Sequence, residues 1–409
     1  MALNIFNEFF ASSGSVQSKS AFGHIKRYKE ENNIPDEIIR FHFKPDRVKN
    51  TLFFLTLDTW SELDPGHVNF IIQNLAGNPN NPKIVIDTTM EDFVGEQFFD
   101  VMYMLSSVGV PADKIIILTS QPQTQNFKNE FYLNDFKTIH YDMFATSYFN
   151  FANDQKLWRE IKPRVLEKHL ICFMKRPRLL RLIANGIMRA KDYDKQSHYS
   201  WHFDFNETRD LFGFRQNLKA FERIKALKLK GTEDIVDIFD SSYIEKQIYD
   251  CIDGNLEWII DPHVADTGGI NLPMETHRKL DTSVMFDEHI KIVDNSFFTE
   301  KTYKNFVYGL PFVGFGIPNY ESRLNSSGYQ CWDNFFKLRV DESNYFSALG
   351  SHIELLDEIC NMSLADLQDQ LNSKESIEML ESNQRMFKLQ HEIKGLITAL
   401  NCIEELFDK

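Results

Sequence analysis

The sequence predicts an α/β protein with two parallel-sheet domains and a C-terminal helical tail. Short apolar segments rich in β-branched residues alternate with segments of helical periodicity, and the connections between them are short. A length of 409 residues also fits two to three domains. Because a strand, a helix and a second strand joined by short connections favour parallel pairing, both halves of the chain indicate Rossmann-like sheets.

The first domain is expected over residues 1–165. Its first 45 residues show no clear pattern, and the segment 121–165 is polar and aromatic without a clear period. A helix is expected between Phe93 and Leu105, where apolar residues recur at helical spacing. Three short apolar runs predict buried strands, at 51–57, 83–87 and 114–119.

The second domain is expected over 166–370, and a helical tail over 371–409. Ser351-x-x-Glu354 and Ser363-x-x-Asp366 match the capping-box pattern, so helices are expected from Ser351 onward. A long amphipathic helix is expected over about 374–406. The other elements expected in this half are a strand at 169–173, a helix at 177–191, a helix at 299–308 and a strand at 311–315.

Composition limits the classes of partner. There are 45 Lys and Arg against 59 Asp and Glu, and the formal charge of −14 disfavours nonspecific coating of nucleic acid. The five cysteines are scattered, which predicts reduced thiols and a cytoplasmic location rather than a disulfide framework or a zinc site. No apolar run approaches 18 residues, so neither a membrane span nor a signal peptide is expected.

A basic cluster follows the strand predicted at 169–173. It has no acidic residue, and Pro177 suits the first turn of the helix that comes next. A helix N-terminus with forked Arg donors is suited to a diphosphate, and the alternative is a solvated basic turn. The candidate diphosphate ligands are Lys175, Arg176, Arg178 and Arg181.

A second cluster lies at the start of the helix predicted at 299–308. Thr299 is a candidate N-cap, which places Glu300 and Lys301 in the first turn. Glu300 could accept hydrogen bonds from a ribose diol, and Lys301 could bind a phosphate or a sugar hydroxyl. The alternative is ordinary helix chemistry, because an acidic residue is favourable in any first turn.

Candidates for a general base come from the first domain. Asp87 ends the strand at 83–87 and Asp58 follows the strand at 51–57, where parallel sheets place ligand-binding residues. The alternative for each is a loop or capping role. His24, His67 and His140 are isolated in the sequence and are expected to be structural or exposed.

The order of these motifs resembles a family of phage and bacterial glycosyltransferase-like proteins. The Glu-Lys element is also similar to the donor-binding segment of fucosyltransferase-like enzymes with the two-domain GT-B fold. The resemblance covers about residues 168–350. The motifs that match are Arg176-Pro-Arg-Leu-Leu-Arg181, Thr299-Glu-Lys-Thr302, Gly309-Leu-Pro-Phe312, Gly328-Tyr-Gln-Cys-Trp332 and Asp341-Glu-Ser343.

The resemblance implies a GT-B arrangement and transfer from a nucleotide-diphosphate sugar, such as a UDP-sugar, to a hydroxyl acceptor. The second domain would bind the donor through the two clusters, and the first would bind the acceptor. The final helix, in 371–409, would brace the domains. A donor-side Glu of the pattern has no secure match here, and Glu275 and Glu288 are only candidates. The only Asp-x-Asp, Asp192-Tyr-Asp194, trails a helix, so no essential metal and no cofactor are expected.

The acceptor is open between two classes. One is a surface glycan, and the other is a hydroxymethylated base of phage DNA, which would place the enzyme in the host cytoplasm. The segment Arg215–Lys230 has six basic residues and one acidic residue, with phenylalanines among them. Such a segment can bind along a nucleic-acid backbone, or it can form the solvent-exposed face of a helix. A non-catalytic nucleotide-sugar-binding or interaction protein on the same scaffold is the alternative function.

Overall fold

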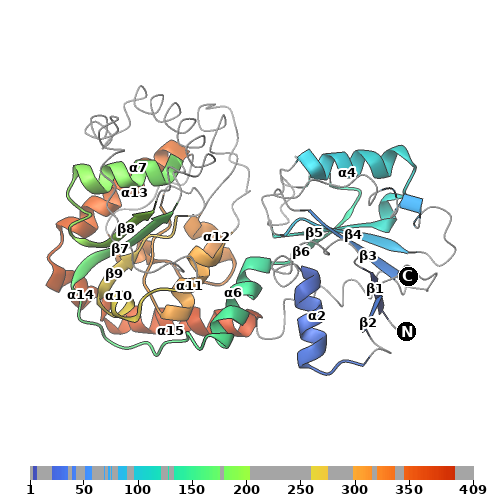
Figure 1. The fold of residues 1–409 in the computed structure, drawn as a ribbon. Coiled ribbons are helices and arrows are strands. Elements are labelled where there is room, and N and C mark those ends of the chain that lie inside the picture. Colours follow the sequence, from blue (N-terminus) through green and yellow to red (C-terminus); the bar gives the residue numbers. More distant parts are fainter. Residues whose placement is uncertain are drawn as a thin grey trace. The chain divides into compact units, whose positions relative to one another are not determined.

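Figure 1 shows the computed structural model of the chain. Contacts divide it into two compact units, unit 1 (Met1–Ser147, Val293–Phe297 and Leu389–Lys409) and unit 2 (Tyr148–Ile292 and Phe298–Lys388). The residues that the structure describes are 3–6, 21–35, 39–42, 51–57, 69, 72–73, 75, 82–89, 96–120, 128, 133–175, 179–202, 259–274, 298–315, 320–336 and 345–391.

Unit 1 contains a six-stranded sheet in which every pairing is parallel. Strand order runs outward from β1 in both directions, so the sheet has a topological switch point between β1 and β3. In spatial order the strands are β2 (Ile39–His42), β1 (Leu3–Phe6), β3 (Thr51–Thr56), β4 (Lys83–Asp87), β5 (Ile115–Thr119) and β6 (Lys137–His140).

Helices cover both faces of this sheet, as Figure 1 shows for α4 and α2. Alternate residues of the strands point to opposite faces, so Phe53 and Ile84 pack against α4, whereas Phe54 and Val85 pack with α2 and the start of α6. Burial on both faces explains why these strands are almost continuously apolar. The helices are α2 (Ala21–Glu31), α4 (Glu96–Ser107) and α6 (Met143–Asp154), with a short 3-10 helix η1 (Ala112–Lys114) before β5.

Unit 2 contains a three-stranded parallel sheet with the order β8 (Ser197–His202), β7 (Lys168–Lys175) and β9 (Gly268–Asn271). Phe312 adds a further parallel bridge beside Asn271. In Figure 1, α7 and α13 lie above the strands and α15 lies below them. The helices of unit 2 are α7 (Leu179–Ala190), α10 (Pro262–Thr267), α11 (Glu300–Tyr308), α12 (Tyr320–Ser326), the 3-10 helix η5 (Trp332–Phe335), α13 (Tyr345–Asn361), α14 (Leu364–Leu371) and α15 (Lys374–Leu389).

Helix α11 is buried along nearly its whole length, and its buried residues include polar and charged side chains as well as aromatic ones. The ring of Tyr303 stacks on that of Phe387 in α15, with centroids 5.4 Å apart and planes 11° apart. The helix ends at Gly309, whose φ of 61° is left-handed and whose N–H donates to the Asn305 carbonyl. The chain then turns directly into the segment that bridges β9.

The α/β class and the parallel sheets predicted from the sequence are confirmed. The predicted strands at 51–57, 83–87, 114–119 and 169–173 all form, as do the helices at 177–191 and 299–308. The sequence patterns did not predict β6, α6, β8, α10 and α12, and the patternless first 45 residues contain two strands and α2.

Of the two caps expected in the C-terminal half, one is wrong and one is confirmed. Ser351 is no cap, because it lies inside α13, which begins at Tyr345. Ser363 is a cap, since its hydroxyl accepts from the Asp366 N–H. Contacts divide the chain between Ser147 and Tyr148, and the domain bounds of 1–165, 166–370 and 371–409 stay a prediction. Helix α15 groups with unit 2 as far as Lys388, and the remainder of the predicted helix, after 391, lies outside the described residues.

Candidate functional site

The carboxyl ends of the unit 2 strands form the first candidate site. Parallel α/β sheets bind ligands at this edge, because the loops that follow the strands converge there. Arg181 lies in the first turn of α7, and its Nη2 donates to the carbonyl oxygen of Met274, 3.4 Å away. Met274 follows the last residue of β9 by three positions. Arg181 is therefore held at the carboxyl end of the sheet, with only 7% of its surface exposed.

The start of α11 belongs to the same unit. The Thr299 hydroxyl caps the helix by accepting from the N–H of Lys301 at 3.3 Å. The Lys301 side chain folds back over this end, and its Nζ lies 3.1 Å from Thr299 Oγ1 and 2.7 Å from Glu300 Oε1. The Lys301 side chain thus contacts both Thr299 and Glu300, and the three predicted residues form one polar cluster.

The ionisation of Glu300 is set by opposing effects. Burial by itself would raise the pKa of Glu300, but the Lys301 ammonium, its hydrogen bond and the nearby Lys304 together hold that pKa below its ordinary value. Glu300 is therefore a carboxylate. The Lys301 side chain is 25% exposed, whereas that of Glu300 is 9% exposed, so an incoming anion would meet the lysine first.

Two asparagines fasten α11 to the sheet. The Asn271 amide at the end of β9 donates to Asn305 Oδ1, and the Asn305 amide donates to the carbonyl oxygens of Lys301 and Thr302, both at 3.0 Å. Both asparagines are almost fully buried. They were missed from the sequence, although an Asn inside an otherwise apolar element is a signal, because a buried amide needs partners.

The structure describes only some of the other residues that were predicted to bind the donor. Lys175 is the last residue of β7, at the same carboxyl edge. Arg176 and Arg178 lie outside the described residues, as do Asp58 and the basic segment 215–230. Asp192 and Asp194 lie in the turns that follow α7, as expected.

Asp87 lies at the carboxyl end of the unit 1 sheet and is fully buried. Its Oδ1 accepts from the N–H of Thr89 at 3.0 Å and from the Thr89 hydroxyl at 2.6 Å. These bonds fix the turn that leaves β4. In this geometry the carboxylate stabilises the loop, and its role as a general base stays a prediction.

A polar network joins the ends of β4, β5 and β6 at this edge. Ser120 Oγ lies 2.8 Å from the Thr89 carbonyl oxygen and 3.1 Å from that of Tyr141. His140 is exposed, and its Nε2 lies 3.2 Å from the Ser120 carbonyl oxygen. Asp142 Oδ1 accepts from the N–H of Ala145 and so caps α6. Sequence reasoning treated His140 as isolated, because its partners come from other strands.

Burial lowers the pKa of His391 to about 4, and its other influences are Asp142, which raises it, and His140, which lowers it. His391 is therefore neutral at pH 7. Asp142 and His140 act on His391 through space even though His391 is more than 240 positions from either in the chain.

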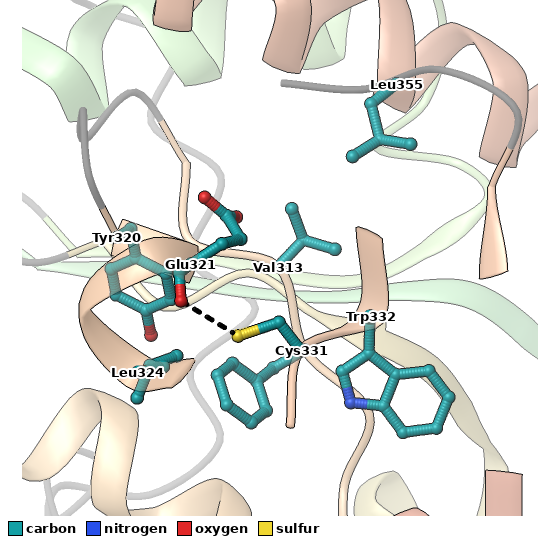
Figure 2. Close-up of a pocket in the computed structure, with 8 residues that line it drawn as sticks. Val313, Tyr320, Glu321, Leu324, Cys331, Trp332 and Leu355 are labelled. Carbon is teal, nitrogen blue, oxygen red and sulfur yellow. Dashed lines mark hydrogen bonds between the residues drawn. The ribbon is translucent and has the colours of Figure 1, made fainter. Parts of the chain in front are cut away.

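Figure 2 shows a small gap in unit 2 among Val313, Glu321, Trp332 and Leu355. The Cys331 thiol donates to the Glu321 carbonyl oxygen at 3.4 Å, drawn as a dashed line. The gap has no room for a water molecule, so it is a packing feature of unit 2.

No family model matches the chain, and no curated protein matches it. Among the described residues, no three His, Cys, Asp or Glu side chains are grouped so that they could hold a metal ion. Across the same part of the chain, the helices are too short or too polar to span a membrane.

Proposed function

We propose that the protein is a glycosyltransferase that moves a sugar from a nucleotide-diphosphate sugar to a hydroxyl acceptor. The observation that carries the proposal is the group formed by Thr299, Glu300 and Lys301 at the start of a buried helix in a parallel-sheet unit. Two parallel α/β units are compatible with a GT-B arrangement. A cytoplasmic location is part of the proposal, supported by the free thiols of Cys172, Cys331 and Cys360.

The donor would be held by side chains that contact one another in the structure, as Lys301 and Glu300 do. Lys301 would leave Glu300 for an anionic or hydroxyl group of the donor, and Glu300 would then accept from the ribose diol. Arg181 would assist the diphosphate, together with Lys175, Arg176 and Arg178. Positive groups placed around the departing diphosphate stabilise the charge that develops as the glycosidic bond breaks.

The second candidate function is a non-catalytic protein that binds a nucleotide-sugar or a partner. It is favoured by the engagement of Asp87 with Thr89, which leaves this expected base in a structural role. An enzyme would hydrolyse or transfer the sugar of a donor, whereas a binding protein would leave the donor intact.

The acceptor is proposed as a hydroxymethylated base of phage DNA or a sugar of a surface glycan. Both present a primary or secondary hydroxyl, so both need the same proton-transfer chemistry. A DNA acceptor would also require the base to leave the duplex or be reached in a groove. Uptake of donor label into hydroxymethylcytosine DNA, but not into glycans, would decide for the first class.

Thermal unfolding with UDP-, GDP- and ADP-sugars tests the donor site. A donor at 100 times its Kd stabilises a protein by about 2.7 kcal/mol, which is a measurable rise in Tm. Glu300→Ala, Arg178→Ala and Arg181→Ala should reduce this rise, whereas Lys374→Ala, which removes an exposed lysine paired with Glu378, should not. Absence of any rise with every donor would remove the donor site.

A donor-by-acceptor screen read by mass spectrometry then tests transfer. It should include hydroxymethylcytosine DNA and lipopolysaccharide-type glycans. A mass gain of one hexose or related sugar on an acceptor supports the enzyme, and intact donor with every acceptor supports the binding protein.

A further inference from the structure

We infer that Asn271 is a positioning residue that holds the two halves of the donor site in one fixed arrangement. The first half is Arg181 in the first turn of α7, and the second is the first turn of α11, which carries Glu300 and Lys301. The inference rests on the proposed donor binding, and all of these residues belong to unit 2. Asn271 would act through other groups, because only 3% of its surface is exposed.

The backbone of Asn271 fixes the end of β9. Its N–H donates to the Pro311 carbonyl oxygen at 2.8 Å, and its own carbonyl oxygen accepts from the Val313 N–H at 3.0 Å. On the other side, the N–H of Leu272 donates to the Ile171 carbonyl oxygen of β7 at 3.0 Å. The chain is therefore hydrogen-bonded on both sides at the point where β9 ends.

The segment that leaves β9 leads to the first half of the site. Met274 lies three residues after Asn271, and its carbonyl oxygen accepts from Arg181 Nη2 at 3.4 Å. Between them, the Pro273 carbonyl oxygen accepts from the Phe315 N–H at 3.4 Å. A short hydrogen-bonded stretch of backbone thus connects Asn271 to the carbonyl group that Arg181 contacts.

The side chain of Asn271 leads to the second half. Its amide donates to Asn305 Oδ1, which fixes the orientation of the Asn305 amide, because only the oxygen of that amide can accept. Asn305 Nδ2 then donates to the carbonyl oxygens of Lys301 and Thr302, at 3.0 Å each. Asn271 therefore ties the first turn of α11 to the same strand end that leads to Arg181.

A nucleotide-diphosphate sugar would need both halves at once, because its ribose and its diphosphate are joined by short covalent links. Two groups joined in one ligand bind more tightly than the separate groups when the spacing of their sites matches, since the second contact is then intramolecular. Sites that are held in place before the ligand arrives also lose less conformational freedom on binding. Asn271 would therefore contribute to the affinity for the joined ligand and not to the affinity for either part alone.

The test compares joined and separate ligands in Asn271→Ala, made in the full chain. The joined ligands are UDP, GDP and ADP, measured by calorimetry, and the separate ones are the matching nucleosides and inorganic pyrophosphate, measured by ligand-observed NMR. We expect the affinity for the nucleoside diphosphate that binds the wild-type protein to fall by about tenfold or more. The affinities for the nucleoside and for pyrophosphate should stay at their wild-type values, whereas the loss of a merely structural residue would weaken all three.

Asn383→Ala is the matched control. Asn383 in α15 is 2% exposed, and its side chain accepts from the Gln330 N–H at 2.8 Å and donates to the Gln330 carbonyl oxygen at 2.9 Å. This variant should lose stability but bind the nucleoside diphosphate with wild-type affinity. If Asn271→Ala does not fold, Asn271→Leu combined with Asn305→Leu replaces it, because removing both amides leaves neither one buried without its partner. The double variant should show the same selective loss.

Each outcome decides for or against the positioning role. Wild-type affinity of the Asn271 variant for the nucleoside diphosphate would overturn it, and so would an equal loss of affinity for the nucleoside and pyrophosphate. If the wild-type protein binds no nucleoside diphosphate, the proposed donor site fails and the positioning role fails with it. If the protein binds one but transfers no sugar to any acceptor, the proposed enzyme fails, and the binding measurements still decide the role of Asn271.

Discussion

Lys301 Nζ lies 2.7 Å from Oε1 of Glu300, the residue immediately before it in α11. Adjacent helical residues do not normally face each other, because successive side chains are about 100° apart around the axis. The contact forms because the lysine folds back over the helix N-terminus, where Thr299 Oγ1 accepts a further hydrogen bond. A buried carboxylate is thereby neutralised by a lysine that is itself partly exposed.

Loss of Lys301 should destabilise the protein by leaving the Glu300 carboxylate buried without its main partner. Breaking a buried ion pair costs about 3–5 kcal/mol, and we expect roughly 2 kcal/mol for Lys301→Met because the lysine is a quarter exposed. Urea unfolding measures the change. Adding Glu300→Gln to Lys301→Met should recover part of the loss, and a double variant no more stable than Lys301→Met would contradict this account.

The stability of unit 1 should decrease in acid because of His24. Its imidazole is buried, with Nδ1 2.6 Å from the Tyr141 hydroxyl and Nε2 3.1 Å from Ser147 Oγ. Burial, and to a lesser extent Arg27, lowers the pKa of His24 from 6.5 to about 4. Between these values the unfolded chain binds the proton and the folded protein does not. The contribution is therefore fully present above pH 6.5 and is lost as the pH falls to 4.

The size of this loss is roughly 3 kcal/mol, since each unit of pKa difference corresponds to about 1.36 kcal/mol. Denaturant unfolding from pH 7 to pH 4 measures it. His24→Gln should have lower stability at pH 7 and a shallower decrease toward pH 4, with His391 and the carboxylates responsible for the remaining slope. An equally steep decrease in His24→Gln would show that His24 does not contribute.

Two glycines should respond to alanine in opposite directions. A Cβ on Gly269 in β9 would lie 2.1 Å from the His169 carbonyl oxygen of the neighbouring strand, so Gly269→Ala must move backbone and should cost several kcal/mol. A Cβ on Gly350 in α13 would meet nothing within 4 Å, so Gly350→Ala should stabilise the helix by about 0.5–1 kcal/mol. Thermal unfolding of the two variants distinguishes them, and similar Tm values would contradict the β9–β7 packing.

The sequence predicted best the elements whose burial leaves a local pattern. Strand β4 is buried at all five positions and reads as one apolar run, and Thr299 is recognisable as a cap from its own sequence. Strand β6 at the sheet edge buries only Ile139 among its four residues, so no apolar run marks it.

The candidate sites were predictable only where their residues are neighbours in the chain. Thr299, Glu300 and Lys301 are consecutive, and they do contact one another. The His140–Ser120 and Asn271–Asn305 pairs join residues 20 and 34 positions apart. Strand pairing brings the first pair together, and the packing of α11 against β9 brings the second. Asp87 was identified by position, but its bond to Thr89 depends on a side-chain rotamer that the sequence does not specify.

Phe387 should couple α15 to the helix that presents Glu300. Its side chain is fully buried, stacks on Tyr303 and has its ring centroid 5.5 Å from that of Phe306, both in α11. Phe387→Ala removes a large buried ring and should cost about 3–5 kcal/mol of unfolding free energy. Phe387→Leu fills more of the space and should cost less. Because α11 loses its packing on one side, the donor-induced rise in Tm should also be smaller in Phe387→Ala. The control is Leu389→Ala at an exposed position two residues on, which should leave both the stability and the donor-induced rise unchanged. Equal stability of the two alanine variants would mean that α15 does not support the site.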